Sequence, residues 1–303
     1  MKPLRRSGPD RHRQRDIVTK LDIRKATRDE FSIAIEWAAR EGWNPGLDDL
    51  AVFHAADPAG FLIGYVDGQP AASISVVRYG GAFGFLGFYI VPPEHRGQGL
   101  GLQIWKAGLA HLAGRTIGLD GVVAQQANYR KSGFELAGRN IRFTGTFSGT
   151  EPAAGVEIQP LARSELADVV DYDRPFFPAK RYLFIEEWCC PTGGARTRTG
   201  VVARADGNLT GFGLIRRCRS GYKVGPLFAD DQRIASAMLS ALCATMEPGS
   251  TVSLDVPEDN AAGTKLAEQA GLEPSFETAR MYKGEIPSLP IARTFGITTF
   301  ELG

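Results

Sequence analysis

The chain has 303 residues, enough for two domains that each bury a core of their own. Hydrophobic residues make up 43% and charged residues 23%, as in soluble globular proteins, and no apolar run reaches the roughly 20 residues that cross a bilayer. The formal net charge of +1 favours neither a nucleic acid nor a membrane surface as a partner.

The first twenty residues differ from the rest of the chain. They contain seven Lys or Arg against Asp10 and Asp16, with few apolar residues among them. A secretory signal requires a continuous apolar stretch, which this segment lacks. We therefore predict that residues 1–20 form a disordered basic extension. An arm for nucleic acid or a membrane surface is the alternative.

Strand and helix patterns alternate over the next seventy residues. The patterns predict strands at residues 21–25, 61–66, 71–78 and 83–91, and a helix at 29–41. Thr27 is placed to cap the helix. The turn sequence Asp67-Gly68-Gln69-Pro70 separates two of the apolar runs, so these are expected to form a hairpin.

A glycine-rich segment follows, with the sequence Val91-Pro92-Pro93-Glu94-His95-Arg96-Gly97-Gln98-Gly99-Leu100-Gly101. Alternate glycines leave backbone N–H groups uncovered where a helix begins, and the helix dipole favours an anion there. We predict a site for a phosphate-bearing ligand. The segment lacks the Lys-Ser/Thr pair of a nucleoside-triphosphate loop. It also departs from the dinucleotide fingerprint, although Asp120 lies about where a ribose-binding acid would be expected.

The residues after this loop continue the alternation. Leu102, Trp105, Leu109 and Leu112 share one face of a helix. A strand is expected at 116–122. The segment Ala127-Asn128-Tyr129-Arg130-Lys131-Ser132-Gly133-Phe134 follows it.

The C-terminal half repeats this order. Runs at 201–205 and 209–217 flank Asp206-Gly207, a helix is expected from Ile234 to Thr245, and a strand at 252–256. Gly68 to Gly133 spans 65 positions and Gly207 to Gly271 spans 64. Matching landmarks at near-equal separation indicate two copies of one domain, joined by the Gly-, Thr- and Pro-rich segment 144–155.

The second copy lacks the features of the predicted anion site. Where the first has its glycine loop, the second reads Pro226-Leu227-Phe228-Ala229-Asp230-Asp231-Gln232-Arg233, and Ala267 stands at the place of Tyr129. The tail at 295–302 is strand-like and follows Pro287 and Pro290. We expect it to pair with a sheet, either within its own domain or across the domain boundary, and a frayed terminus is the alternative.

Cysteine and histidine usage argues against a disulfide or metal framework. Cys189 and Cys190 are adjacent, Cys218 and Cys243 are isolated, and no Cys-x-x-Cys spacing occurs. The four histidines are scattered. We expect reduced thiols in a cytoplasmic protein and no metal site.

Two motifs in order carry a family resemblance. Arg96-x-x-Gly99-x-Gly101, between a strand and a helix, resembles the acyl-CoA signature of the GNAT-type N-acetyltransferase superfamily. The segment 127–134 looks like the tyrosine-then-Gly-Phe segment of the same superfamily. The resemblance covers roughly residues 21–145 well and the remainder in outline.

The resemblance implies an α/β (α+β) fold of two tandem GNAT-like domains. Each would have a mixed, largely antiparallel central sheet flanked by helices. We expect a catalytic domain at 21–148, a degenerate GNAT-like domain at 156–285 and a strand-like tail at 286–303. The second domain is expected to stabilise the first and to shape the acceptor site.

The resemblance also implies a donor site for acetyl-CoA. Backbone N–H groups of the loop would hold the pyrophosphate, and the Arg96 side chain would add charge; the loop residues are Gly97, Gln98, Gly99, Leu100 and Gly101. The backbone of Ile90 and Val91 would pair with the pantetheine arm, with the Val91 N–H at the oxyanion. Asn128 is placed either to bond the pantetheine or to cap local backbone.

Tyr129 is the candidate general acid for the departing thiolate, since a tyrosine pKa near 10 keeps it protonated at neutral pH. A tyrosine that only packs in the core is the alternative. The general base stays open. Many relatives carry a carboxylate where this chain has Phe88, so a water relay, Glu36 or an acid of the loop 42–49 could substitute. Trp43, Asp49 and Phe88 are candidates for the acceptor site.

These features predict an N-acyltransferase that moves an acetyl group from acetyl-CoA to a small-molecule amine by direct attack in a ternary complex. A non-catalytic acyl-CoA sensor and a protein-lysine acetyltransferase are the alternatives. We expect a monomer or a homodimer, with no nucleic acid, membrane or metal involved.

Overall fold

The computed structural model describes residues 19–150, 155–191 and 197–303. All but the end of the expected basic extension therefore lies outside the described residues. Within them, no helix is both long and apolar enough to cross a membrane.

The N-terminal half contains most of the elements that the sequence predicts. In chain order they are β1 (Asp22–Lys25), α1 (Arg28–Arg40), α2 (Asp49–Ala56), β2 (Phe61–Val66), β3 (Gln69–Tyr79), β4 (Phe83–Ile90), η1 (Pro93–His95), α3 (Leu100–His111), β5 (Thr116–Val122), η2 (Val123–Gln125), α4 (Gln126–Lys131) and β6 (Glu135–Thr146). The expected strands and helices are confirmed to within a few residues. The helix α2 was not foreseen.

The C-terminal half repeats the same order. Its elements are β7 (Glu157–Pro160), η3 (Arg163–Glu165), α5 (Leu166–Asp173), η4 (Arg174–Phe176), α6 (Tyr182–Cys189), β8 (Arg198–Ala205), β9 (Asn208–Arg217), β10 (Tyr222–Ala229), α7 (Gln232–Cys243), β11 (Thr251–Pro257), α8 (Ala261–Gln269), β12 (Glu273–Lys283), η5 (Ile291–Arg293) and β13 (Thr294–Gly296). The predicted duplication is thus visible element by element.

Local chemistry explains several boundaries. Thr27 and Glu30 form a reciprocal capping box at the start of α1, with the Thr27 side chain accepting from the Glu30 N–H. Asp67 and Gly68 have φ values of +48° and +77°, and Asp206 and Gly207 have +50° and +79°. Both hairpins therefore use a turn with two left-handed residues, which matches the twist of paired strands.

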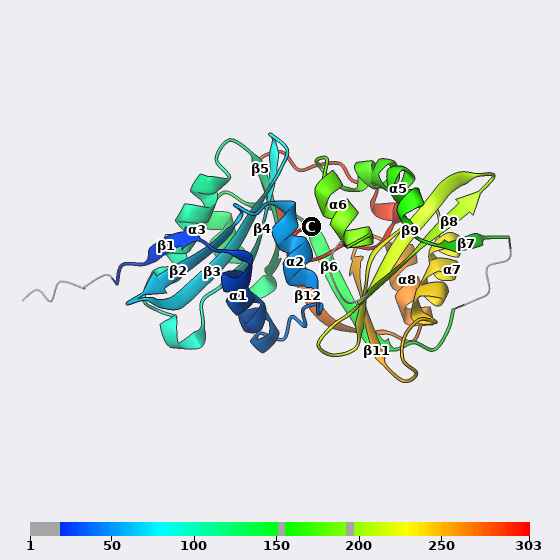
Figure 1. Cartoon of the computed structure of the whole chain (residues 1–303), viewed down its shortest axis with the longest axis horizontal. Coiled ribbons are helices and arrows are strands. Elements are labelled where there is room, and N and C mark those ends of the chain that lie inside the picture. The colour runs from blue at the N-terminus through cyan, green and yellow to red at the C-terminus, as the bar shows by residue number, and fades with distance from the viewer. Residues whose placement is uncertain (1–18, 151–154, 192–196) are drawn as a thin grey trace, which may run out of the picture.

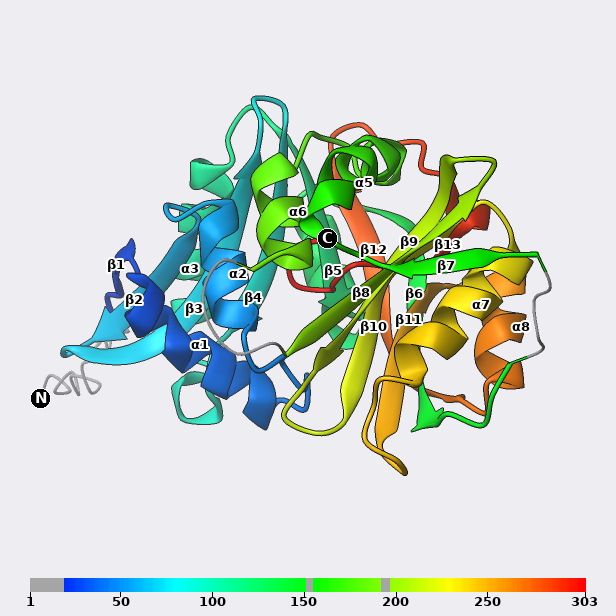
Figure 2. The ribbon, with the colours of Figure 1, turned by 45° about the vertical axis from the view of Figure 1, so that its right-hand side comes forward.

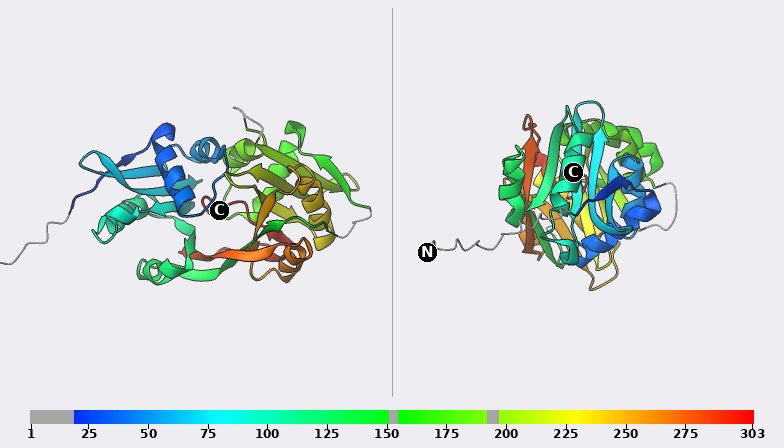
Figure 3. Two further views of the ribbon diagram at one scale, coloured as in Figure 1. Left: turned by 90° about the horizontal axis from the view of Figure 1, so that it is seen from below. Right: turned by 90° about the vertical axis from the view of Figure 1, so that its left-hand side faces the viewer.

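The described strands form one continuous sheet, in the order β1-β2-β3-β4-β5-β12-β6-β11-β10-β9-β8-β7. Most neighbours are antiparallel, and β4–β5 and β10–β11 are parallel. The last long strand of each half pairs with a strand of the other half. β12 pairs with β5, β6 pairs with β11, and the two pair with each other where they bridge the halves (Figure 3, left).

This exchange joins the two halves more tightly than the sequence suggests. The two halves repeat one order of elements, but neither half completes its sheet with its own last strand. An ion pair reinforces the exchange, because Arg280 of β12 donates 2.6 and 2.8 Å hydrogen bonds to the Asp120 carboxylate of β5.

Apolar side chains gather in three clusters. One lies between α3 and the N-terminal strands, and a second between the C-terminal strands and the pair α7 and α8. The third joins the halves, with α2 packed against α6 (Figures 1 and 2). Phe53 and Trp188 stack there with ring centroids 5.9 Å apart.

The C-terminal tail lies between the two halves (Figure 2). β13 pairs with β10, which confirms that the tail joins a sheet, but the strand is only three residues long. Residues 297–303 continue as buried chain without strand pairing. The Tyr79 hydroxyl donates to the Leu302 carbonyl at 3.0 Å, and Arg181 donates to the Gly303 carbonyl at 2.8 Å.

Candidate active site

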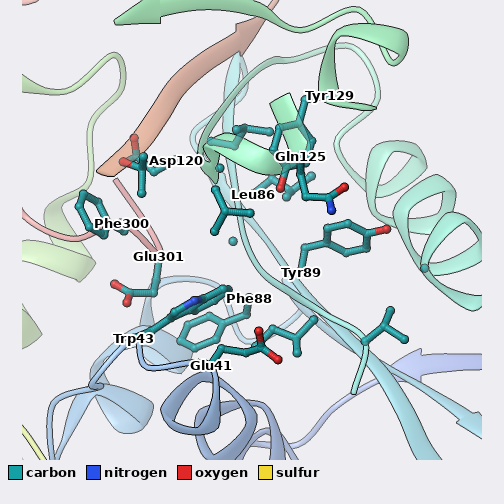
Figure 4. Close-up of a pocket in the computed structure, with 18 of the residues that line it drawn as sticks. Glu41, Trp43, Leu86, Phe88, Tyr89, Asp120, Gln125, Tyr129, Phe300 and Glu301 are labelled. Atoms are coloured by element: carbon teal, nitrogen blue, oxygen red, sulfur yellow. The ribbon is translucent and has the colours of Figure 1, made fainter. Parts of the chain in front are cut away.

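A cavity of about 490 Å³ opens where β4 and β5 diverge (Figure 4). The register between the two strands ends at Leu86 opposite Leu119, although β4 continues to Ile90 and β5 to Val122. Parallel strands that separate in this way leave the facing backbone groups of β4 without a β5 partner. The cavity is lined by both strands, the glycine loop, α4 and the C-terminal tail.

The glycine loop forms one end of the cavity and leads into α3. Gly97 and Gly99 have φ values of +77° and +76°, and a Cβ atom at either position would meet no atom within 4 Å. Gly99 is the N-cap of the twelve-residue helix α3 and has no side chain to cap it. The first N–H groups of α3 therefore face open space at the positive end of its dipole, which suits a phosphate group.

The two long side chains of this loop turn back onto the protein. Arg96 donates from Nε to the Val91 carbonyl at 2.8 Å and from Nη2 to Glu41 at 2.5 Å. Gln98 donates to the Glu94 carbonyl at 3.1 Å. In this arrangement Arg96 fixes the bend between β4 and the loop, while remaining half exposed at the cavity rim.

Tyr129 lies on the opposite side of the cavity from β4. Its ring stacks on Trp105 with centroids 5.4 Å apart and packs against the backbone of Gly121, where a Cβ atom would collide with it. Burial raises the pKa of the Tyr129 hydroxyl above its usual value. The hydroxyl makes no hydrogen bond to any described residue, so a protonated, unpartnered O–H faces the cavity.

Of the other residues predicted for the donor site, some line the cavity and Asn128 does not. Ile90, Val91, Leu100 and Gly101 line the cavity. Asn128 does not. Its side chain contacts Gln125 at 2.7 Å and Lys131 at 3.3 Å, and Gln125 is the polar residue of this region that reaches the cavity.

The far end of the cavity is a chamber walled by aromatic rings. Trp43 and Phe88 line it, as predicted from the sequence, together with Phe276 of β12 and Phe300 of the tail. Phe88 has a φ of +45°, unusual for an aromatic residue, and sits at an irregularity in the β3–β4 register. Its carbonyl accepts a 2.9 Å hydrogen bond from Ser73, which holds this bulge.

Comparison with known proteins agrees with this geometry. Residues 22–134 match the acetyltransferase (GNAT) family, and residues 169–296 match a second acetyltransferase (GNAT) domain. A holothin acyltransferase from a Pseudoalteromonas species is 31% identical over 278 residues, 92% of this chain and 93% of that protein. The chain belongs to the GNAT acetyltransferase family.

Solved structures show the same tandem fold. A putative acetyltransferase from Pyrococcus horikoshii superposes with a TM-score of 0.76 at 19% identity, covering 93% of this chain and 96% of that one. A tandem GNAT protein from the clavulanic acid biosynthesis pathway gives a TM-score of 0.61 at 13% identity, covering 89% of this chain and all of that one. The protein is therefore a tandem GNAT acyltransferase.

In the second GNAT domain, β10 and β11 separate as β4 and β5 do, and the C-terminal tail occupies the gap between them. The β10–β11 register ends at Val224 opposite Leu254, in the same way as the β4–β5 register. Here β13 pairs with β10, and Ile297 donates its N–H to the Asp255 carbonyl of β11 at 2.9 Å. The tail thus occupies the space that corresponds to the open cavity of the first domain.

The helix that follows this second gap is also closed to anions. α7 begins directly after Asp231, whose carboxylate accepts the Ile234 N–H at 2.8 Å. Asp230 adds a second negative charge and pairs with Arg293 at 2.5 Å. A phosphate group would meet two carboxylates at this helix terminus in place of open N–H groups.

Asp49 corrects one prediction from the sequence. Its side chain is 1% exposed, accepts the Gly46 N–H at 2.7 Å, and pairs with Arg198 at 2.6 Å and Arg216 at 3.2 Å. Despite the opposing effect of burial, these two guanidinium charges hold the Asp49 pKa below its usual range. Asp49 joins the two halves and does not line the cavity.

Two other acids considered from the sequence have structural partners. Glu36 pairs with Arg219 on the surface, which ties α1 to the C-terminal half. Asp120 has no exposed side-chain surface and is held by Arg280 and Asn140. A ribose-binding role for Asp120 is excluded by these contacts.

The sequence did not reveal what β12 and the tail contribute to the cavity. Phe276, Thr278, Phe300 and Glu301 all line it, together with Arg142 of β6. Their relevance depends on the strand exchange and on the path of the tail, neither of which leaves a local pattern. The only signal available was the apolar content of residues 295–302.

Proposed function

We propose that the protein transfers an acyl group, acetyl being the expected one, from acyl-CoA to the amine of a small molecule. The observation that carries this proposal is a single cavity that connects the glycine loop, the unpaired edge of β4 and Tyr129 to an aromatic acceptor chamber. The donor and the acceptor could then meet in one ternary complex.

The residues present fit an acyl-CoA donor. The loop suits its pyrophosphate at Gly97 and Gly99, where the space beside the backbone is open, and at the start of α3 that follows. The backbone of Ile90, which ends β4, and of Val91, which follows it, suits the amides of the pantetheine arm, with the Val91 carbonyl also accepting from Arg96. The Val91 N–H is our candidate for the oxyanion contact. Asn128 would have to break its contact with Gln125 to take part.

In the proposed reaction the amine nitrogen attacks the thioester carbonyl, and the carbon–sulfur bond breaks. Tyr129 gives its proton to the departing sulfur, which its raised pKa permits since the hydroxyl stays protonated throughout the neutral range. Trp43 and Phe88 would orient the acceptor and exclude water from the thioester.

A screen of amines with acetyl-CoA, read by thiol release, tests this function. We expect release above the hydrolysis background with at least one small amine, and holothin is the first compound to include because of the 31% identical relative. Tight acetyl-CoA binding without release for any acceptor would instead support a non-catalytic acyl-CoA sensor. Position 88, where many relatives carry a carboxylate, is a phenylalanine in this chain, and this favours the sensor as the second candidate.

A protein-lysine acceptor fits the cavity less well. The tail and β12 wall the acceptor chamber, with Phe276, Phe300 and Glu301 contributed by these segments. A peptide chain needs a groove open along its length, whereas the walls of this chamber come from both halves of the molecule. We therefore propose a small-molecule acceptor.

A further inference from the structure

The C-terminal tail carries a carboxylate into the acceptor chamber. Glu301 is 5% exposed and lines the cavity beside Trp43 and Phe300, across from Tyr129 and Gln125 (Figure 4). Its backbone lies directly against Gly87 of β4, where a Cβ atom would collide with the Glu301 carbonyl oxygen. The close contact fixes the position of Glu301 relative to the β4 bulge at Phe88.

Three carboxylates line the cavity, and their partners distinguish them. Glu41 is paired with Arg96, and Asp120 is held by Arg280 and Asn140. Within the described ranges, the Glu301 carboxylate has neither a hydrogen bond nor a cation at ion-pair distance. The Glu301 oxygen atoms can therefore accept a hydrogen bond from a ligand in the cavity.

The cations that face Glu301 are committed to other groups. Arg142 makes 2.6 and 2.8 Å hydrogen bonds to Asp255, Arg216 pairs with Asp49 at 3.2 Å, and Lys223 donates to the Trp43 carbonyl at 2.7 Å. Each interacts electrostatically with Glu301 over a longer distance. None of the three lies at ion-pair distance from Glu301, so its oxygen atoms are available to a ligand.

We propose that Glu301 is the general base of the reaction and that the acceptor is a small amine with an apolar or aromatic body. The inference rests on the function proposed above. As the nitrogen–carbon bond forms, one N–H proton of the amine passes to the Glu301 carboxylate. The carbon–sulfur bond breaks, and the sulfur takes the Tyr129 proton. Exchange with solvent then restores both side chains.

The walls of the chamber specify the acceptor class. Four aromatic side chains line the cavity together with Glu301, the one of its carboxylates without a protein partner among the described residues; they are Trp43, Phe88, Phe276 and Phe300. Such a chamber suits an apolar or planar group that carries one amine. A polyamine or a peptide with several charges would leave buried cations without partners.

The test is steady-state kinetics of Glu301→Gln with acetyl-CoA and the amine that serves the wild type best. We expect kcat to fall by about 10²–10⁴-fold, with unchanged acetyl-CoA affinity by calorimetry. The deficit should narrow as hydroxide replaces the base at high pH. Glu285→Gln, an exposed carboxylate shortly before the tail, is the matched control and should keep wild-type rates.

A wild-type kcat in Glu301→Gln would overturn the inference. This holds also if KM for the amine rises, because Glu301 would then bind the amine without accepting its proton. Should the Gln variant fail to fold, Glu301→Asp keeps the charge and withdraws the carboxylate by one methylene. We expect at least a tenfold loss of kcat, and an undiminished kcat would refute the role. A wild-type protein without turnover on any amine would defeat the proposed function itself.

Discussion

Replacing Tyr129 by Phe tests the proposed acid with little disturbance of the fold. The phenyl ring keeps the stacking on Trp105 and the packing against Gly121. The lost hydroxyl has no hydrogen-bond partner among the described residues, so we expect the free energy of unfolding to change by less than about 1 kcal/mol. The change should therefore act on chemistry and hardly on stability.

The expected kinetic effect follows from the lost proton donor. General acid catalysis contributes about 10²–10⁴-fold, which corresponds to roughly 3–5 kcal/mol of transition-state stabilisation. We expect kcat for Tyr129→Phe to fall by that range and KM for acetyl-CoA to change little, since the hydroxyl acts as the thiolate forms. The deficit should shrink at high pH, where the thiolate departs without a proton.

The assay is thiol release over pH 6 to 9, with thermal unfolding measured on the same samples. Tyr182→Phe removes the hydroxyl of a 49% exposed tyrosine on α6 and is the matched control. A Tyr129→Phe protein with wild-type kcat at every pH would refute the reasoning and reduce Tyr129 to a packing residue.

Three further changes test other parts of the structure. Gly99→Glu should abolish coenzyme A binding in calorimetry, because the new carboxylate covers the N–H groups at the start of α3. Gly99→Ala is the control, since it has the same left-handed backbone strain without the charge. Equal affinities of the two variants for coenzyme A would contradict the loop assignment. Gly87→Ala should lower kcat strongly, because the added methyl group displaces the Glu301 backbone. Gly81→Ala is the control and should keep the wild-type kcat, since the space around its Cβ position is open. A wild-type kcat in Gly87→Ala would show that activity does not depend on the position of the tail against β4. Burial lowers the pKa of Lys223 to about 8, so the unfolded chain binds more protons than the folded one above that pH and stability rises with pH. Denaturant titration should show that the unfolding free energy of the wild type rises by about 2 kcal/mol between pH 8 and 10 relative to that of Lys223→Met. A difference between the two proteins that stays constant over this pH range would show that the Lys223 pKa is not lowered.

The parts of the site that the sequence predicted are those formed by neighbouring residues. The glycine loop, the cap at Thr27 and the hairpin turns each depend on a few adjacent positions, and the structure has all of them. Tyr129 belongs to the same class, because its distance from the loop is set by one helix and one strand.

The remainder depends on contacts between distant segments. β6 and β12 have similar patterns, and nothing in either strand indicates that they exchange partners. Asp49 looked like an acid of an open loop, but α2 turns it toward Arg198 and Arg216, whose positions only the assembled halves define. Glu301 was overlooked for the same reason, since its surroundings exist only once the tail enters the space between the domains.

The central claim is that acyl-CoA occupies the first domain and that the tail fills the corresponding gap of the second. The crystal structure of the protein with acetyl-CoA tests this most directly. We predict one molecule per chain, with its pyrophosphate on the loop from Gly97 to Gly101 and its thioester between β4 and Tyr129. A donor bound beside β10 and α7, or two donors per chain, would contradict the claim.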